Sequence, residues 1–282
     1  MEIIRIPRIM RDTSLGHLLH SRTLGFVPTM GALHEGHMSL MRMSKEENSV
    51  TAVSIFVNPT QFGPSEDFAS YPRRMEEDVA KLREADIDIL FLPDASVMYP
   101  EGFATLVEVK GLSEKMCGHF RPGHFRGVTT VVAKLLTIVR PSRAYFGQKD
   151  FQQTVVIKRM AKDLNLDAEI VVCPTIREHD GLAMSSRNAY LSGEQRAAAT
   201  VLYRSLCRAS GAIKTGTRSG AAVRDMLQQD LSREPMITSI DYATVFIPET
   251  LDEADEITGE VLLAIAARMG STRLIDNMLA AP

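Results

Sequence analysis

The sequence predicts an α/β protein with a parallel sheet domain over residues 1–176 and a smaller α+β C-terminal domain over residues 177–282. Three observations favour this fold class. Short runs rich in Val, Ile and Phe alternate with stretches of helical spacing in the first part of the chain, which is typical of a parallel sheet with helices on both faces. Beyond Cys173 the pattern changes to a loop, two helical stretches and several strand-like runs. The length of 282 residues also favours two domains, at roughly 150 residues for each.

Each element follows from its hydrophobic pattern, because buried strands read as continuous apolar runs and surface helices carry an apolar stripe. The strands predicted in the first domain are Leu24–Val27, Thr51–Val57, Ile87–Leu92, Arg143–Phe146 and Glu169–Val172. The helices predicted between or after them are His37–Lys45, Pro72–Ala85, Val128–Val139 and Phe151–Asp163. The second domain is predicted to contain helices Gly193–Ser210 and Ser219–Ser232 and strands Ile240–Phe246, Val261–Ala267 and Thr272–Ile275.

Composition narrows the class of protein. Hydrophobic residues make up 45% and charged residues 24%, as in ordinary globular proteins. The net charge of −3 predicts no nucleic-acid partner, although it allows a local phosphate site. Three separated cysteines without a CxxC pair favour reduced thiols in the cytoplasm. Met1–Arg11 lacks the apolar core of a signal peptide, and no window of 18 apolar residues predicts a membrane span.

The segment Pro28–His37 is the first candidate site, because it begins where a predicted strand ends and runs into a predicted helix. Ligands of open parallel sheets bind beyond the carboxyl ends of the strands, and a helix N-terminus there suits phosphate. Gly31 and Gly36 allow the backbone to approach a ligand closely. His34 and His37 lie three residues apart, so both rings are expected to face the same way and to donate hydrogen bonds to phosphate oxygens. The alternatives are two surface histidines and, less favoured, a zinc site, which lacks further ligands of the required spacing.

Two further segments follow predicted strands. Phe56–Gly63 carries amides that suit a small polar substrate, although Asn58-Pro59 is also a common turn dipeptide. Residues 63–72 after it are loop-like and are predicted to form a mobile lid. Ala144–Gln153 offers Lys149 for phosphates and Asp150 for a ribose hydroxyl; alternatively, Asp150 caps a helix and Lys149 is solvated.

Two loops remain ambiguous from their residues alone. Gly181–Asn188 contains Ser185, Ser186 and Arg187, which either clamp a polyphosphate or form an ordinary polar surface loop. Met116–Gly127 carries four possible cations, and it either holds an anion or contacts another subunit. No Gly-x4-Gly-Lys-Ser/Thr loop and no Gly-x-Gly-x-x-Gly after a strand is found, so P-loop and dehydrogenase functions lack support.

Together these segments resemble the pantothenate synthetase family, a branch of the nucleotidyltransferases with a His-x-Gly-His signature. The resemblance extends over nearly the whole chain. It is carried by Pro28–His37, Phe56–Phe62, Arg121–Val128, Tyr145–Asp150 and Ser185–Asn188, in that order. It implies a Rossmann-like nucleotidyltransferase domain that joins pantoate to β-alanine with ATP and Mg²⁺. Pantoate would first form pantoyl adenylate and pyrophosphate, and β-alanine would then displace AMP. A cytoplasmic homodimer is also implied.

The resemblance assigns roles to individual residues. His34, His37 and Lys149 would be catalytic, with His37 as the general acid, and Gln61 and Gln153 would bind pantoate, with Gln61 also near β-alanine. The ATP site would comprise Met30, Gly31, Ala32, Leu33, His34, Glu35, Gly36, His37, Gly147, Gln148, Lys149, Asp150, Ile176, Met184, Ser185, Ser186 and Arg187. No protein metal ligand is expected. Met184, Ser185, Ser186 and Arg187 stand where related synthetases keep a lysine-rich mobile loop, so phosphate binding there would rest more on hydroxyl groups.

Two other functions stay open at this point. A nucleotidyltransferase that stops at an adenylylated product would not depend on an amine. A nucleotide-sensing module would bind ATP without turnover, although the presence of His34, His37 and Lys149 argues against it.

Overall fold

The computed structural model describes residues 1–64 and 66–282, and these divide into two compact units. The first unit comprises Met1–Ser113, Arg121–Gln148 and Gln153–Pro174. The second comprises Glu114–Phe120, Lys149–Gln152 and Thr175–Pro282. The second unit thus includes two short segments from earlier in the chain, one of which contains Lys149. The predicted domain boundary after residue 176 stays a prediction.

A six-stranded parallel sheet forms the centre of the first unit, which confirms the predicted fold class. The strand order is β1-β4-β3-β2-β5-β6. The strands are β1 (Glu2–Ile4), β2 (Leu24–Thr29), β3 (Val50–Ile55), β4 (Ile89–Phe91), β5 (Arg143–Gly147) and β6 (Glu169–Cys173). Successive strands are added to one side of β2 as the chain runs through β3 to β4, and to the other side of β2 as it runs through β5 to β6. The direction therefore reverses between β2 and β5, where open α/β sheets bind their ligands.

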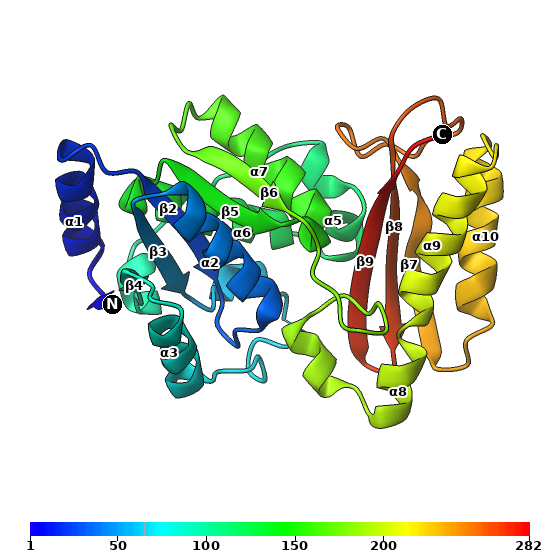
Figure 1. The fold of residues 1–282 in the computed structure, drawn as a ribbon, viewed down its shortest axis with the longest axis horizontal. Helices are drawn as coiled ribbons and strands as arrows, with labels where there is room; N and C mark the ends of the chain where they lie inside the picture. The colour runs from blue at the N-terminus through cyan, green and yellow to red at the C-terminus, as the bar shows by residue number, and fades with distance from the viewer. Residues whose placement is uncertain (65) are drawn as a thin grey trace. The chain divides into compact units, whose positions relative to one another are not determined.

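Helices cover this sheet (Figure 1). They are α1 (Pro7–Leu19), α2 (Glu35–Glu47), α3 (Met75–Glu84), α4 (Ala95–Met98), α6 (His124–Val139) and α7 (Phe151–Asp163), whose first two residues belong to the second unit. Helix α2 packs on β2, β3 and β5. Leu40 and Met41 of α2 and Leu82 of α3 share one hydrophobic cluster with Val27 and Val53 of the sheet.

The second unit is built on an antiparallel sheet of β7 (Ile237–Phe246), β8 (Val261–Met269) and β9 (Thr272–Ala280), in that order. Figure 1 shows α9 (Val201–Lys214) and α10 (Gly220–Ser232) side by side on this sheet. The single helix predicted over residues 193–210 is wrong. The structure has α8 (Gly193–Ala198) and then α9: Ala199 is the C-cap of the first helix and Thr200 the N-cap of the second, although both keep right-handed helical dihedral angles. No Gly or Pro lies in residues 194–210 to signal that break.

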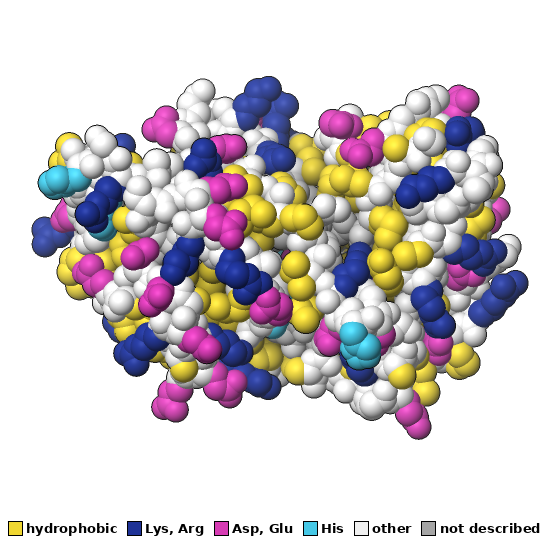
Figure 2. All heavy atoms as spheres, viewed as in Figure 1, with side chains coloured by type: hydrophobic (Ala, Val, Ile, Leu, Met, Phe, Trp, Pro, Cys, Tyr) yellow, Lys and Arg dark blue, Asp and Glu magenta, His cyan; other side chains and the backbone are white. Residues whose placement is uncertain are grey.

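Short elements complete the described chain. They are the helix α5 (Cys117–Phe120) and the 3₁₀ turns η1 (Pro59–Gln61), η2 (Leu112–Glu114), η3 (Gln148–Asp150) and η4 (Ser186–Tyr190). Figure 2 shows Lys and Arg side chains interspersed with Asp and Glu on the visible face, in line with the small net charge. None of the helices in residues 1–64 and 66–282 combines the length and apolar character that a membrane crossing requires.

Candidate active site

The loop between β2 and α2 has an unusual backbone that two local features explain. Gly31 lies at φ +83° and Ala32 at φ +50°, both in the left-handed region that favours glycine. A Cβ at Gly31 would also lie 3.0 Å from Oδ2 of Asp78. Both the dihedral angle of residue 31 and the close approach of a carboxylate therefore favour glycine there.

Helix α3 holds this loop through two charged side chains. Asp78 is only 1% exposed, and its carboxylate accepts from the backbone N–H of Ala32 at 2.8 Å and of Leu33 at 2.7 Å. Three residues further along the same helix, Lys81 Nζ donates to the carbonyl oxygen of Leu33 at 2.6 Å. A carboxylate that accepts two N–H groups satisfies the donors that the left-handed turn leaves outside regular structure. These contacts fix the backbone one residue before His34.

His34 and His37 cap helix α2 reciprocally. His34 is the N-cap residue, and its Nδ1 accepts from the N–H of Gly36 at 3.2 Å. Nδ1 of His37 accepts in turn from the N–H of His34 at 3.3 Å. The two ring centroids lie 4.1 Å apart with the planes tilted by 40°. The rings therefore lie together, as their spacing in the sequence predicts.

This capping determines which ring nitrogen carries the proton. In both rings Nδ1 accepts from a backbone N–H, so the proton of each neutral imidazole is on Nε2. Adding a second proton would place a hydrogen on Nδ1, opposite a backbone donor. In its neutral form each ring therefore presents Nε2–H as a donor at the positive end of the α2 dipole. Donors of this kind suit the oxygens of a phosphate group.

The segment after β3 holds Gln61 in a defined orientation. Asn58 is 1% exposed, and its Nδ2 donates to Gln61 Oε1 at 3.0 Å and to the carbonyl of Gly127 at 3.1 Å. Tyr99 Oη donates to Asn58 Oδ1 at 2.7 Å, which fixes the Asn58 amide. Gln61 Nε2 then donates to Met30 Sδ at 3.2 Å. The loops that follow β2 and β3 thus meet, and Gln61 presents its amide donor toward the Met30 side.

The basic segment 119–126 contains two side chains that support Gln61 and the loop after it. His124 Nδ1 and the Gln61 carbonyl oxygen are 2.8 Å apart, and Arg121 Nη1 lies 3.1 Å from His124 Nε2. Arg121 binds both carboxylate oxygens of Glu66 at 2.6 Å. Burial alone would raise the pKa of Glu66, but the hydrogen bond and charge of Arg121 outweigh it and hold that pKa at about 2. The predicted lid includes residue 65, which lies outside the described residues, and its mobility stays a prediction.

The other predicted site residues of the first unit lie at the ends of β5 and α7. Gly147 is the last residue of β5, Gln148 begins η3, and Gln153 lies in the first turn of α7. Because β2 and β5 are neighbours in the parallel sheet, Gly147 lies at the same sheet edge as the loop that carries His34.

The remaining predicted residues belong to the second unit. Lys149 is half-buried and Asp150 exposed, both in η3. The N–H of Met184 donates to the carbonyl of Ile176 at 3.0 Å, so these two residues face each other across the turn formed by residues 177–183. Ser185 caps η4, its Oγ accepting from the N–H of Arg187 at 3.2 Å. Ile176, Met184, Ser185, Ser186 and Arg187 therefore form one local group.

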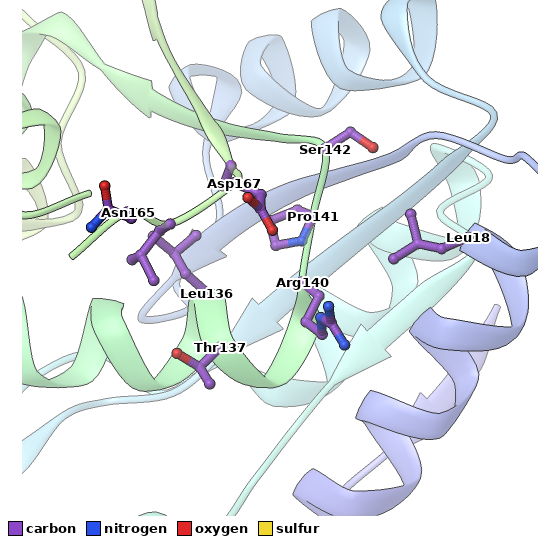
Figure 3. A pocket seen from close by; sticks show the side chains of 10 residues that line it. Leu18, Leu136, Thr137, Arg140, Pro141, Ser142, Asn165 and Asp167 are labelled. Atoms are coloured by element: carbon purple, nitrogen blue, oxygen red, sulfur yellow. The ribbon is translucent and has the colours of Figure 1, made fainter. Parts of the chain in front are cut away.

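A pocket of about 490 Å³ lies elsewhere in the first unit (Figure 3). Leu18 of α1 and Leu136 and Thr137 of α6 line it, together with the connection Arg140–Ser142 that enters β5. It is at the amino ends of β5 and β6, opposite the edge where parallel sheets bind ligands, and it contains none of the predicted site residues.

The structure also bears on metal binding. Within residues 1–64 and 66–282, no group of three or more His, Cys, Asp or Glu side chains is arranged to hold a metal ion. The described side chains therefore do not fit a protein-held metal site.

Sequence reasoning missed several residues that shape this site. Asp78 lies in an acidic run, Glu76-Glu77-Asp78, that reads as a solvated helix face, and only its burial reveals its role. Asn58 belongs to a segment whose amides the sequence predicts to suit a small polar substrate, whereas its support of Gln61 was not predicted. The sequence signal that could have identified Asn58 is an amide placed between the end of a buried strand and a proline.

Comparisons with known proteins agree with the family resemblance. A family model described as pantoate-beta-alanine ligase matches residues 2–279. A pantothenate synthetase of Thermodesulfovibrio yellowstonii is 54% identical, with 99% of each chain covered. One of Moorella thermoacetica is 51% identical, with 99% of this chain and 98% of that protein covered.

Solved structures of the same family match the fold. A pantothenate synthetase of Thermus thermophilus superposes with a TM-score of 0.93 at 44% identity, covering 99% of both chains. A pantoate-beta-alanine ligase of Francisella tularensis, complexed with β-γ ATP and β-alanine, superposes with a TM-score of 0.81 at 35% identity, covering 99% of this chain and 97% of that one.

Proposed function

Because the chain belongs to the pantoate–β-alanine ligase family of enzymes, we propose that it joins (R)-pantoate to β-alanine with ATP, giving pantothenate, AMP and pyrophosphate. The observation that carries this proposal is the pair of reciprocally capped imidazoles at the switch point of the sheet, in a chain that matches the family over its whole length. The ATP and β-alanine bound by the Francisella relative support the choice of these two substrates.

The first half-reaction forms pantoyl adenylate. A carboxylate oxygen of pantoate attacks the α-phosphorus of ATP. The bond from that phosphorus to the oxygen that bridges the α- and β-phosphates breaks. Negative charge moves onto the departing pyrophosphate. Fixed donors that meet this charge lower the barrier without a protein nucleophile, and holding pantoate in line supplies the rest by proximity.

His34 and His37 supply such donors through Nε2–H. For His37 the resemblance implies a general acid, but the capping geometry favours donation without proton transfer. An imidazolium would need a proton on Nδ1, where the N–H of His34 already points. We therefore assign both rings as neutral hydrogen-bond donors to phosphate oxygens.

Gln61 and Gln153 are proposed to bind pantoate. The Oε1 of Gln61 accepts from Asn58, so its Nε2 is directed to act as donor to a carboxylate or hydroxyl oxygen. In the second half-reaction the amine of β-alanine attacks the acyl carbon near Gln61. The carbon–oxygen bond to the phosphate breaks, AMP leaves, and the ammonium proton passes to solvent.

The nucleotide contacts are proposed on the family pattern. The backbone of residues 30–37 would contact ATP, with Gly147 and Gln148 close to the nucleotide. Lys149 would bind a phosphate, Asp150 a ribose hydroxyl, and the backbone of Ile176 the adenine. Met184, Ser185, Ser186 and Arg187 would bind the polyphosphate. Mg²⁺ is proposed to arrive on the ATP phosphates as part of the substrate. A homodimer in the cytoplasm completes the proposal.

An isotope-exchange assay tests this function. Labelled pyrophosphate should enter ATP only when pantoate is present, and adding β-alanine should release AMP with pantothenate. Accumulation of ADP would exclude an adenylate. If exchange occurs but added β-alanine releases no AMP, the protein is a nucleotidyltransferase that stops at the adenylate. ATP binding without exchange would indicate a nucleotide-sensing module.

A further inference from the structure

Two consecutive side chains of β9, Asp276 and Asn277, are buried although both are polar. They are 2% and 5% exposed. Strand β9 is an edge strand of the three-stranded sheet of the second unit, where its neighbour is β8 (Figure 1). Edge strands offer backbone and side-chain groups to other segments of the chain. Here both residues use that edge to hold segments that the proposed function places at the nucleotide.

Asp276 anchors the turn between Ile176 and Met184. Its carboxylate binds Arg177 through two hydrogen bonds of 2.6 and 2.9 Å. Arg177 Nη1 also donates to the carbonyl of Gly181 at 3.0 Å, and its Nη2 donates to the carbonyl of Asn277 at 3.2 Å. The guanidinium lies 4.1 Å from the ring centre of Tyr203. The turn of residues 177–183 is therefore fixed to β9 at its first residue.

Asn277 anchors the segment that contains Lys149. Its Nδ2 donates to the carbonyl oxygen of Lys149 at 2.8 Å. Its own N–H donates to Oδ1 of Asp276 at 2.8 Å, which joins the two anchors. Lys149 and Arg177 are far apart in sequence, yet their backbones are held by adjacent residues of one strand.

We propose that Asp276 and Asn277 are positioning residues that set the placement of Lys149 relative to residues 176–187, so that both segments engage one ATP. This inference rests on the proposed function of those segments. The reason is geometric: phosphate, ribose and adenine contacts are made together only when the two segments keep a fixed spacing. A rigid strand that holds both supplies that spacing before the ligand binds, which lowers the ordering cost of binding.

A second ion pair of the same sheet provides a matched control. Arg273 on β9 and Asp241 on β7 pair at 2.7 Å, and their side chains are 14% and 12% exposed. This pair resembles that of Arg177 and Asp276 in charge, strand and burial. It contacts neither Lys149 nor residues 176–187 in any recorded hydrogen bond among the described residues. A variant of it therefore reports the effect of losing a pair in this sheet without moving the proposed anchors.

The test uses Asn277→Ala, Arg177→Lys, their double variant and the control Asp241→Asn, each in the full chain. Pantoate-dependent exchange is measured while ATP and pantoate are varied separately. Asn277→Ala loses one hydrogen bond and should raise the KM for ATP about fivefold to tenfold. Arg177→Lys loses the paired geometry with Asp276 and should raise it at least as much. Both should leave the KM for pantoate within about twofold. The double variant should cost little more than either single one, because the relative placement is already lost. Asp241→Asn should lower the urea midpoint without changing the KM for ATP.

Three outcomes would overturn the proposal. The first is a KM for ATP in Asn277→Ala that equals the wild-type value. The second is a double variant in which the effects of the two anchor variants multiply. The third is a shift in the KM for ATP in Asp241→Asn as large as that in the anchor variants. If Arg177→Lys fails to fold, Asn277→Ala still decides, because it leaves the buried ion pair intact. Absence of exchange in the wild-type protein would instead refute the proposed function, so the two failures are distinguishable.

Discussion

Three replacements of His37 separate the two hydrogen-bonding roles of its ring. Nδ1 accepts from the N–H of His34 and completes the cap of α2, whereas Nε2 carries the donor proton proposed for phosphate. Asparagine places an amide oxygen near the Nδ1 position and keeps only the cap. Glutamine reaches further and keeps a donor near the Nε2 position. Alanine keeps neither group.

The expected changes in rate and stability follow from which of the two groups each variant loses. Losing one preorganised donor to developing charge costs roughly 10²–10³ in rate, so His37→Ala and His37→Asn should lose about that much. His37→Gln should lose only about tenfold, because a donor to a charged group survives with poorer geometry. Losing the cap costs about 1 kcal/mol, so the free energy of unfolding should fall in His37→Ala and His37→Gln and stay near wild type in His37→Asn.

The rates are measured as pantoate-dependent pyrophosphate exchange at saturating substrates, and stabilities by urea unfolding. His17→Gln, on α1 of the same unit, is the matched control and should change neither quantity. If His37→Gln is as slow as His37→Ala, then proton transfer by the ring is required. The assignment of His37 as a neutral donor would then be refuted.

Further variants test the surroundings of the site. Asp78→Asn should slow exchange about tenfold, because one loop N–H loses its acceptor, while Glu77→Gln on the exposed side of α3 should not; equal rates for Asp78→Asn and wild type would contradict the role of that carboxylate. Glu66→Gln should flatten the pH dependence of stability. The folded pKa of Glu66, about 2, is below its ordinary 4.5, so its ionisation stabilises the fold above pH 4.5 and that contribution disappears as the pH falls toward 2. Identical urea midpoints for both proteins across that range would rule this out. Gly127→Ala should destabilise the fold by about 1–3 kcal/mol, since its Cβ would overlap the backbone carbonyl oxygen of Thr60 in η1; an unchanged urea midpoint would show that α6 can shift.

The inner strands of the central sheet were predictable because they are buried on both faces. Val50–Ile55 is buried at every position, and a continuous apolar run is the sequence signal of such a strand. The strand Glu2–Ile4 and the helix after it were not predicted. The strand is three residues long, and Ile6 and Ile9 near it are exposed, so the hydrophobic pattern there carries little information.

The spacing of His34 and His37 predicted that their rings lie together, because three residues at a helix start bring side chains to one side. The contacts that hold them were not predictable. Asp78 is 45 residues from the Leu33 N–H that it accepts from, and no local pattern links the two. The pairing of Arg121 with Glu66 likewise joins two loops that only the folded sheet brings together. Local chemistry predicts which residues form a site, whereas tertiary packing decides which of them support it.

The place of β9 in the chain also has a consequence for biosynthesis. Asp276 and Asn277 leave the ribosome after both segments that they hold, since synthesis runs from the N-terminus. A nascent chain that ends before β9 has Lys149 and the turn at Arg177 already made, yet it lacks the carboxylate and the amide that fix them. The growing polypeptide therefore acquires those two contacts only once β9 has been translated.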